Sequence, residues 1–299
     1  MDYINCETCQ KNKPIPLYEI HGYKIVRCKN CGLVYVNPQP SDQELEFFYE
    51  KIFHTPAWFA QFPQLKNFAS FKETPEAILG SKNYIDGIVK YKTDGNLLDV
   101  GAGYGELLKF AEDYSFQTWG VEPSSIAAIR AKKICRGKII TSTLEKAELP
   151  NAFFDVIVSV GTIEHLKSPR EAIKKMGRLL KQGGLLVLQT PNIDSWQYRV
   201  QKEKWEQFTV PGHLFYFSPK TLTLLLKNIG FQVKFIDQRM PLWAGPFYGS
   251  IIENKSLSPK NKYWKYIYGL LPWQIENLLS QFKGKILGKH DLIIYAIKK

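Results

Sequence analysis

The sequence predicts an α/β fold with a parallel sheet, preceded by a small metal-bound unit. Three observations lead to this prediction. From Asn96 onward, short apolar runs alternate with runs of helical length, as strands and helices do in parallel α/β proteins. The first apolar run ends in a glycine-rich turn at 101–105. Two Cys-x-x-Cys pairs stand near the amino terminus, well before the sheet.

The amino-terminal cysteines form a predicted zinc site. Cys6 and Cys9 are separated from Cys28 and Cys31 by eighteen residues, a spacing typical of a four-thiolate zinc site. Disulfides are the alternative, which a reducing cytosol disfavours. We expect residues 1–40 to form a zinc ribbon with short strands at 17–20, 23–27 and 33–36. Such a small unit needs the folding energy of a structural metal, and four thiolates leave that metal no open position.

Residues 41–79 are predicted to form an aromatic, helical linker or lid. Ser41 followed by Glu44 has the pattern of a capping box, and Pro75 favours the start of a second helix. Aromatic residues are frequent around and between these helix starts: Phe47, Phe48, Tyr49, Phe53, Trp58, Phe59, Phe62, Phe68 and Phe71. The segment is either a lid over a site or core material that joins the two units.

Residues 80–299 are predicted to form the sheet domain. After the strand that ends near residue 100, strands are expected at 117–121, 138–141, 154–160, 185–189, 231–237 and 291–297, with helices at 106–114, 169–180 and 219–229. The run 154–160 is almost continuously apolar, which favours a central position in the sheet. Two connections, 193–217 and 241–290, are expected to be insertions on the substrate side. Cys135, in a helical stretch, is expected to be a core residue.

The glycine-rich turn and a later acid predict a cofactor crevice. Glycine at alternate positions after Asp99 lets the backbone turn tightly against a ligand. The spacing is Gly-x-Gly-x-Gly, whereas the NAD fingerprint needs its third glycine where Glu106 stands. Glu122 ends the next predicted strand, and an acid there can accept both ribose hydroxyls of an adenosine-containing cofactor.

The motifs LLDVGAGYG at 97–105 and GVEPS at 120–124 resemble those of the class I S-adenosylmethionine (SAM)-dependent methyltransferases. Residues 1–50 are similar to the ribbon that precedes many small-molecule and sugar methyltransferases. The resemblance covers roughly 80–299 and implies a Rossmann-like seven-stranded sheet whose last strand runs antiparallel. It implies SAM as the cofactor, held by Asp99, Gly101, Ala102, Gly103, Gly105, Glu122, Pro123, Thr143, Leu144, Gly161 and Ile163. Among these, Asp99 and the turn would hold the methionine end, Glu122 the ribose, and Thr143 with Leu144 the adenine.

Two histidines are candidates for the catalytic base. Methyl transfer to a hydroxyl requires a group that removes its proton. His165 stands in a Glu-His pair that is common among small-molecule methyltransferases, where it often serves architecture. His213 resembles the histidine of the sugar C-methyltransferases, which carry Tyr-Glu-His where this chain has Pro211-Gly212-His213. That departure weakens carbon methylation and leaves His213 as a candidate base for an oxygen acceptor.

The sequence therefore predicts a SAM-dependent methyltransferase that O-methylates a small-molecule or sugar hydroxyl in a biosynthetic pathway, of a glycan or a secondary metabolite. Sugar C-methylation and RNA methylation stay open as alternatives. The net charge of +12 and the ribbon favour RNA, and the lack of an Asn-Pro-Pro-Tyr-type base pocket opposes it. Phosphorylated, nucleotide-linked and lipid-linked acceptors all fit the positive charge.

The chain is expected to be a cytoplasmic protein. It has no apolar run of 18 residues, and its first residues lack the pattern of an export signal. A basic, aromatic stretch around Lys260, Lys262, Tyr263 and Trp264 could nevertheless lie on a membrane surface, cover the edge of the sheet or form a dimer contact.

Overall fold

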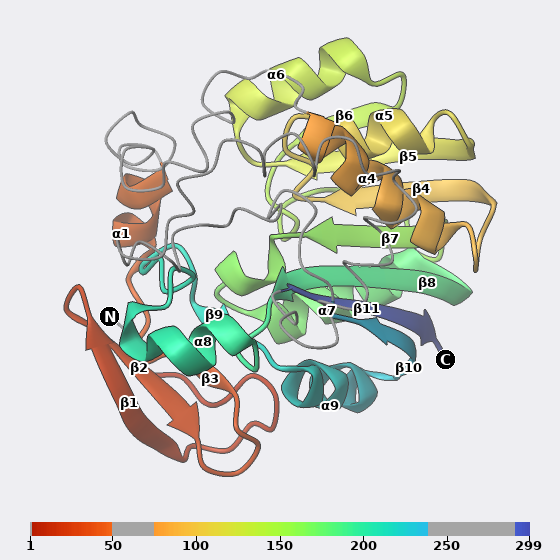
Figure 1. Cartoon of the computed structure of the whole chain (residues 1–299). Coiled ribbons are helices and arrows are strands. Elements are labelled where there is room, and N and C mark those ends of the chain that lie inside the picture. Colours follow the sequence, from red (N-terminus) through yellow and green to blue (C-terminus); the bar gives the residue numbers. More distant parts are fainter. Residues whose placement is uncertain (1, 50–74, 239–290) are drawn as a thin grey trace, which may run out of the picture.

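A computed structural model describes residues 2–49, 75–238 and 291–299, with only the backbone of 75–80 (Figure 1). These residues form a seven-stranded sheet and a four-stranded sheet. The predicted α/β fold is thereby confirmed. Most of the predicted lid, 50–74, and the insertion at 241–290 lie outside the described residues. None of the helices in the described ranges combines the length and the apolarity that crossing a bilayer requires.

The large sheet has the order β10-β11-β8-β7-β4-β5-β6. The four pairings among β8, β7, β4, β5 and β6 are parallel, and β11 near the other edge runs antiparallel to both β8 and β10. The apolar strand β7 occupies the centre, as its sequence predicts, because both of its faces are covered. The strands are β4 (Asp94–Val100), β5 (Ser115–Glu122), β6 (Lys138–Thr141), β7 (Phe154–Val160), β8 (Leu180–Pro191), β10 (Phe231–Asp237) and β11 (Asp291–Lys298).

Helices cover both faces of this sheet. One core cluster joins the sheet to α4 (Pro75–Ile88), α5 (Glu106–Ala111) and α6 (Ser125–Ile134). The other joins it to α7 (Pro169–Leu179) and α9 (Pro219–Ile229). Cys135 is buried in the first cluster, as expected, and its thiol donates to the carbonyl oxygen of Gly105 at 3.2 Å.

Several element boundaries differ from the prediction, among them the start of β8 and the end of α5. β8 begins at Leu180 instead of residue 185, because the residue that caps α7 is already extended and pairs with Phe154. α5 ends at Ala111 instead of residue 114, and the chain turns directly into β5. Both differences lie at the amino-terminal edge of the parallel strands, away from the edge where cofactors bind in such folds.

The ribbon has β1 (Pro14–Ile20), β2 (Tyr23–Cys28) and β3 (Val34–Val36), followed by α1 (Asp42–Phe47) with the predicted capping box between Ser41 and Glu44. Its sheet is completed by β9 (Phe215–Tyr216), which comes from the 193–217 connection. In Figure 1 the red ribbon lies beside the teal segment of α8 (Trp196–Gln201) and β9, on the side to which β7 and β8 point. The ribbon is therefore paired with a strand that the sheet domain contributes.

Aromatic side chains fill the space between the ribbon and the 193–217 connection. Phe208 packs edge-on against Tyr18 of β1, Trp205 and Tyr216, with ring centroids 4.7–5.7 Å apart. The sequence predicts the 193–217 connection to be an insertion on the substrate side. Of its aromatic residues, Trp196 is exposed and the others are buried, so the buried ones pack the connection against the rest of the protein.

Candidate active site

Glu122 links the glycine turn to the end of β5. Its carboxylate accepts hydrogen bonds from the N–H of Gly103 at 2.8 Å and from the N–H of Ser124 at 2.7 Å. Gly101, Gly103 and Gly105 have φ values of 79°, 53° and 88°, a left-handed conformation that explains glycine at all three positions. Glu122 is only 7% exposed. Burial raises the pKa of this carboxyl, and the two N–H groups act in the opposite direction.

Asp99 is the second acid at this edge of the sheet. It is 4% exposed, and its Oδ1 has no hydrogen-bond partner among the described residues. Burial, followed by repulsion from Glu122 and Glu106, raises the pKa of Asp99 to about 8. A buried oxygen without a partner is unfavourable, so a cationic ligand group would stabilise the ionised form.

The other residues predicted to contact the cofactor follow the ends of neighbouring strands. Ala102 donates its N–H to the carbonyl of Val121 at 3.1 Å, which folds the turn back over β5. Gly161 donates its N–H to the side-chain oxygen of Gln189 at 2.8 Å. Leu144 and Ile163 are buried, whereas Pro123, Thr143 and Gly161 are exposed. All of them follow the carboxyl ends of β4, β5, β6 or β7, where doubly wound folds bind ligands.

The turn itself has open space on one side and packing on the other. A Cβ atom placed on Gly103 would meet nothing within 4 Å, whereas one on Gly101 would overlap the hydroxyl of Thr162. The unpaired oxygen of Asp99 and the carboxylate of Glu122 are acceptors that fit an adenosyl cofactor with a cationic amino-acid end. The residues of this crevice are therefore compatible with SAM.

The two candidate bases lie together. His165 is the last residue of η3 (Ile163–His165), directly after β7, and His213 precedes β9. Their ring centroids are 4.6 Å apart at an interplanar angle of 77°. The N–H of Leu214 donates to the carbonyl of Glu164 at 2.8 Å, which joins the two segments beside the pair. Residues 48 positions apart in sequence thus form one site.

Backbone carbonyls set the protonation of both rings. Nδ1 of His165 lies 2.9 Å from the carbonyl oxygen of Gly212, and Nδ1 of His213 lies 2.8 Å from that of Gln207. A carbonyl can only accept, so each Nδ1 carries a proton and each Nε2 keeps its lone pair. Burial lowers the pKa of His165 to about 4 and, with repulsion from His165, that of His213 to about 3. Both rings are therefore neutral near pH 7.

Glu164 and Tyr49 join this site without having been singled out in the sequence as its members. Glu164 is buried, its Oε2 has no partner among the described residues, and burial raises its pKa to about 8. Glu164, His165 and His213 each have one atom of a kind that can bind a metal, a carboxylate oxygen or a ring nitrogen, and these three atoms lie within 4.8 Å of one another. The Tyr49 hydroxyl lies 3.1 Å from Nδ1 of His165 and donates to the carbonyl of Gly212 at 3.2 Å. The adjacency to His165 could have indicated Glu164, and Tyr49 belongs to the aromatic segment predicted as a linker or lid, where nothing distinguishes it from the other aromatic residues.

The four cysteines meet in a separate cluster in the ribbon. Their Sγ atoms lie within 4.8 Å of one another, with 3.4 Å between Cys6 and Cys31 and 3.6 Å between Cys9 and Cys28. All four are free thiols. The second turn closes at Gly32, where φ is 91° and the N–H donates to the carbonyl of Cys28 at 2.9 Å. Four sulfur donors from two tight turns are the donor set of tetrahedral zinc, and they fit that metal.

Comparisons with known proteins agree with this geometry. Residues 79–234, more than half of the chain, match the methyltransferase domain family. The chain is 27% identical over 175 residues to a tRNA U34 carboxymethyltransferase of Haemophilus ducreyi, covering 55% of this chain and 54% of that protein. It is 28% identical over 175 residues to an uncharacterized methyltransferase of Geobacillus, covering 54% and 82%. The chain thus spans only about half the length of the tRNA-modifying relative.

Solved structures show the same fold. A SAM-dependent methyltransferase from Thermotoga maritima superposes with a TM-score of 0.51 at 19% identity, covering 85% of this chain and 99% of that one. A SAM-dependent methyltransferase from Mesorhizobium loti gives a TM-score of 0.50 at 14% identity, covering 73% and 98%. The family match, the sheet order and the glycine-rich turn all indicate the same fold. The chain belongs to the methyltransferase domain family and has the fold of the class I SAM-dependent methyltransferases.

Proposed function

We propose that this protein uses SAM to O-methylate a hydroxyl of a small molecule or sugar in a biosynthetic pathway, of a glycan or a secondary metabolite. The observation that supports this best is the pair of neutral histidines beside the predicted cofactor crevice. Both rings keep an Nε2 lone pair because their Nδ1 protons are held by backbone carbonyls. A hydroxyl acceptor needs such a base, whereas an amine that arrives neutral does not.

The residues of the site divide the work as follows. Glu122 would hold the ribose hydroxyls, Asp99 and the glycine turn the amino-acid end, and Thr143 with Leu144 the adenine. When bound, SAM supplies an electrophilic methyl group. His213 takes the acceptor's proton on Nε2, while its Nδ1 keeps its own proton, donates it to the carbonyl of Gln207 and so orients the ring.

Glu164 supports this proton transfer electrostatically. The imidazolium formed on His213 would be unfavourable in a buried site without a counter-charge. The carboxyl of Glu164 lies within 4.8 Å of the metal-ligating type of atom in both histidines. Its pKa of about 8 keeps it largely protonated near pH 7, so it would supply that charge by ionising as the imidazolium forms. Burial also excludes water, which leaves the acceptor hydroxyl as the aligned nucleophile.

The experiment is methyl transfer from SAM labelled with a deuterated methyl group to a library of sugars, sugar phosphates, nucleotide-linked sugars and phenols, read by mass spectrometry. We expect a labelled product whose fragments place the methyl group on oxygen. His213→Ala should lose turnover, and His165→Ala should lose less. A product methylated only on nitrogen, or full turnover by His213→Ala, would contradict the proposal.

Carbon methylation of a sugar is the second candidate, and the placement of Tyr49 and Glu164 favours it. Removing a proton next to a carbonyl needs a base and a proton donor at the carbonyl oxygen. The hydroxyl of Tyr49 and the carboxyl of Glu164 accompany the two histidines, although neither stands directly before His213, where the sugar C-methyltransferases carry Tyr-Glu. Deuterium exchange of a keto-sugar C–H by the enzyme without SAM would indicate this reaction, and its absence would leave oxygen as the acceptor atom.

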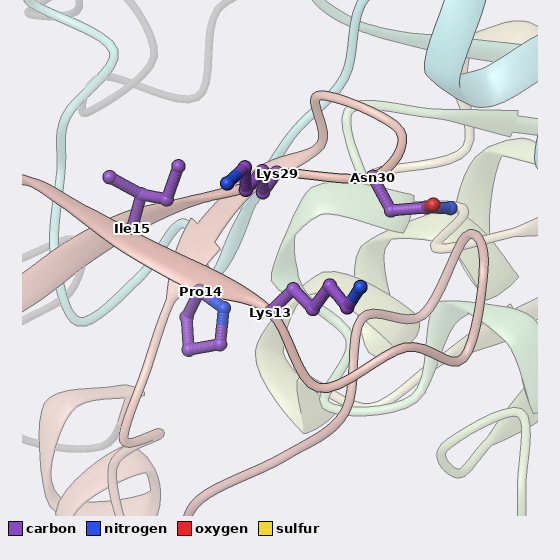
Figure 2. Close-up of a pocket in the computed structure, with 5 residues that line it drawn as sticks. All are labelled: Lys13, Pro14, Ile15, Lys29 and Asn30. Atoms are coloured by element: carbon purple, nitrogen blue, oxygen red, sulfur yellow. The ribbon is translucent and has the colours of Figure 1, made fainter.

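RNA methylation is the third candidate. It is favoured by the relatives named tRNA U34 carboxymethyltransferase and by the net charge of +12. Figure 2 shows a surface pocket on the ribbon lined by two basic side chains, Lys13 and Lys29, with Pro14, Ile15 and Asn30. Such a basic pocket can contact phosphates. RNA binding would weaken steeply with salt, whereas binding of a neutral sugar would not.

The domain organisation and the metal also belong to the proposal. The ribbon of residues 1–40 would hold one structural zinc through Cys6, Cys9, Cys28 and Cys31, supported by the clustering of their thiols. Residues 41–79 would act as linker or lid, and the 193–217 and 241–290 segments as substrate-side insertions of the 80–299 domain. An acceptor that is phosphorylated, nucleotide-linked or lipid-linked fits the basic charge, and peripheral membrane contact would serve the lipid-linked form.

A further inference from the structure

We propose that the ribbon is a positioning element of the active site, and that β3 holds β9, and with it His213, against the segment that carries Glu164 and His165. This inference rests on the proposed role of His213 as the base. It differs from treating the ribbon as an independent module, because the residues that hold the site come from both units.

The first observation is a continuous run of backbone hydrogen bonds from the ribbon to the histidine pair. β3 and β9 are antiparallel, with Val34 opposite Tyr216 and Tyr35 opposite Phe215. The N–H of Val36 donates to the carbonyl of Leu214 at 2.9 Å. The N–H of Leu214 in turn donates to the carbonyl of Glu164 at 2.8 Å. Residue 214 therefore connects β3 on one side with the segment of Glu164 and His165 on the other.

Side chains reinforce this pairing. The ring of Tyr35 is fully buried and stacks on Phe215, with centroids 6.2 Å apart and an interplanar angle of 12°. The hydroxyl of Tyr216 donates to the carbonyl oxygen of His213 itself, at 2.9 Å. Since β9 has only two residues, it has too few contacts of its own to fix the position of His213.

The first cysteine turn joins the ribbon to α7 and α9, which cover one face of the large sheet. Arg170, at the start of α7, donates from Nε to the carbonyl of Glu7 and from Nη2 to that of Thr8, both at 2.7 Å. Asn228, near the end of α9, donates to the same Thr8 carbonyl at 3.1 Å. Because Glu7 and Thr8 lie between Cys6 and Cys9, the turn that would bind metal is fixed to α7 and α9. The ribbon is thus held at two places, by β9 and by α7 with α9.

The second cysteine turn leads directly into β3. The N–H of Cys28 donates to the carbonyl of Leu33 at 2.8 Å, the residue before β3. A metal bound to Cys28 and Cys31 would fix this turn and therefore the register of β3. Metal occupancy and the geometry of the histidine pair are expected to be linked through this short path.

The test uses the full-length protein and two pairs of variants. Val36→Pro removes the N–H that bonds Leu214, and Leu17→Pro places the same change at the bulge of the outer strand β1, away from β9. Arg170→Ala loosens the first cysteine turn. Its matched control is Arg136→Ala, which removes an arginine that also donates to a backbone carbonyl, that of Glu112 at 2.7 Å, far from the ribbon.

Three measurements read the position of His213 without a known acceptor. They are amide hydrogen exchange at Leu214, the imidazole pKa of His213 by NMR, and SAM affinity by calorimetry. Among the described residues, the titratable groups facing His213 are His165 and Glu164 from η3 and Tyr216 from β9. Hydration of a displaced ring should raise its pKa toward the ordinary value of about 6.5, since burial is the main cause of the depression.

We expect Val36→Pro to speed exchange at Leu214 by about tenfold or more, to raise the pKa of His213, and to leave SAM affinity within about twofold. Arg170→Ala should act in the same direction with a smaller effect, and both controls should leave the pKa of His213 unchanged. If Val36→Pro does not fold, the pKa and exchange measured in Arg170→Ala test the inference alone. An unchanged pKa and unchanged exchange in Arg170→Ala and in any folded Val36→Pro would overturn the inference.

Failure of the proposed function would look different. If the pKa and exchange shift as expected while His213→Ala transfers methyl groups at the wild-type rate, the ribbon still positions β9, but His213 is not the base. If His213→Ala loses turnover while Val36→Pro and Arg170→Ala leave His213 undisturbed, the base assignment stands and the positioning role of the ribbon is wrong.

Discussion

Replacing Glu122 by glutamine should weaken SAM binding while leaving the fold intact. The carboxylate accepts N–H bonds from Gly103 at 2.8 Å and Ser124 at 2.7 Å, so both of its oxygens already face donors. Glutamine keeps one acceptor oxygen, but its amide nitrogen would face one of those N–H groups. The variant would therefore lose an acceptor for a ribose hydroxyl and also loosen the turn at Gly103.

The expected size of the effect follows from these contacts. A hydrogen bond to a charged acceptor contributes about 1.5–3 kcal/mol, and one factor of ten in affinity corresponds to about 1.4 kcal/mol. Loss of one such bond in Glu122→Gln should weaken SAM binding about 10- to 100-fold. Glu122→Ala removes both acceptors and should weaken it by about 10²- to 10⁴-fold.

Glu112 provides a matched control in the same helix–strand unit. Its Oε1 accepts from the N–H groups of Arg136 and Gly137, each at 2.8 Å, and from the hydroxyl of Thr118 at 2.7 Å. It lies just beyond the end of α5, whereas the glycine turn lies at the start of that helix. Glu112→Gln should lower the melting temperature without changing the dissociation constant for SAM beyond about twofold.

Isothermal calorimetry of SAM and S-adenosylhomocysteine against the two variants and the wild type measures this difference. The reasoning would be refuted by a Glu122→Gln protein that binds SAM as tightly as the wild type. Equal weakening by Glu112→Gln would also refute it, because the loss would then reflect general destabilisation and not a ribose contact.

Three further predictions address the base, the buried acid and the metal. His213→Ala should reduce turnover by about 10²- to 10⁴-fold with SAM affinity unchanged, as measured by calorimetry beside steady-state rates; a parallel loss of affinity would argue for a binding role. In the protein without SAM, burial raises the pKa of Asp99 to about 8, whereas a cationic amino-acid end favours the carboxylate. SAM binding should therefore release a proton, and the affinity for SAM should rise between about pH 6 and 7.5. Calorimetry in buffers of different ionisation enthalpy should detect that release, and Asp99→Asn should abolish it. Elemental analysis should find one zinc per chain, lost in Cys9→Ser together with a lower melting temperature, whereas Cys135→Ser should keep the metal.

The sequence predicts best the elements whose ends are marked by local start and stop signals. α9 and β10 match the expected limits because Ser218 and Pro219 start the helix and Gly230, with φ of 100°, ends it. β6 and β7 also match, since each is an apolar run between polar turns. The antiparallel direction of the last strand is predicted only by the family resemblance, since periodicity does not report strand direction.

What the sequence does not reveal depends on partners far along the chain. β9 has two residues, and it is a strand only because β3, about 180 residues earlier, pairs with it. Tyr49 reaches His165 across 116 residues, and the sequence places it in the aromatic linker or lid without distinguishing it from the other aromatic residues there. The pairing of His165 with His213 is likewise a result of the Leu214–Glu164 hydrogen bond. Local patterns therefore predict the candidates, and the fold alone shows which of them meet.

A crystal structure of the full chain with S-adenosylhomocysteine tests the central claim most directly. We predict that both ribose hydroxyls bond the carboxylate of Glu122, that the amino-acid end lies at Asp99 and the glycine turn, and that the sulfur faces His213. A nucleoside bound away from Glu122, or a sulfur directed away from the histidine pair, would contradict this account of the site.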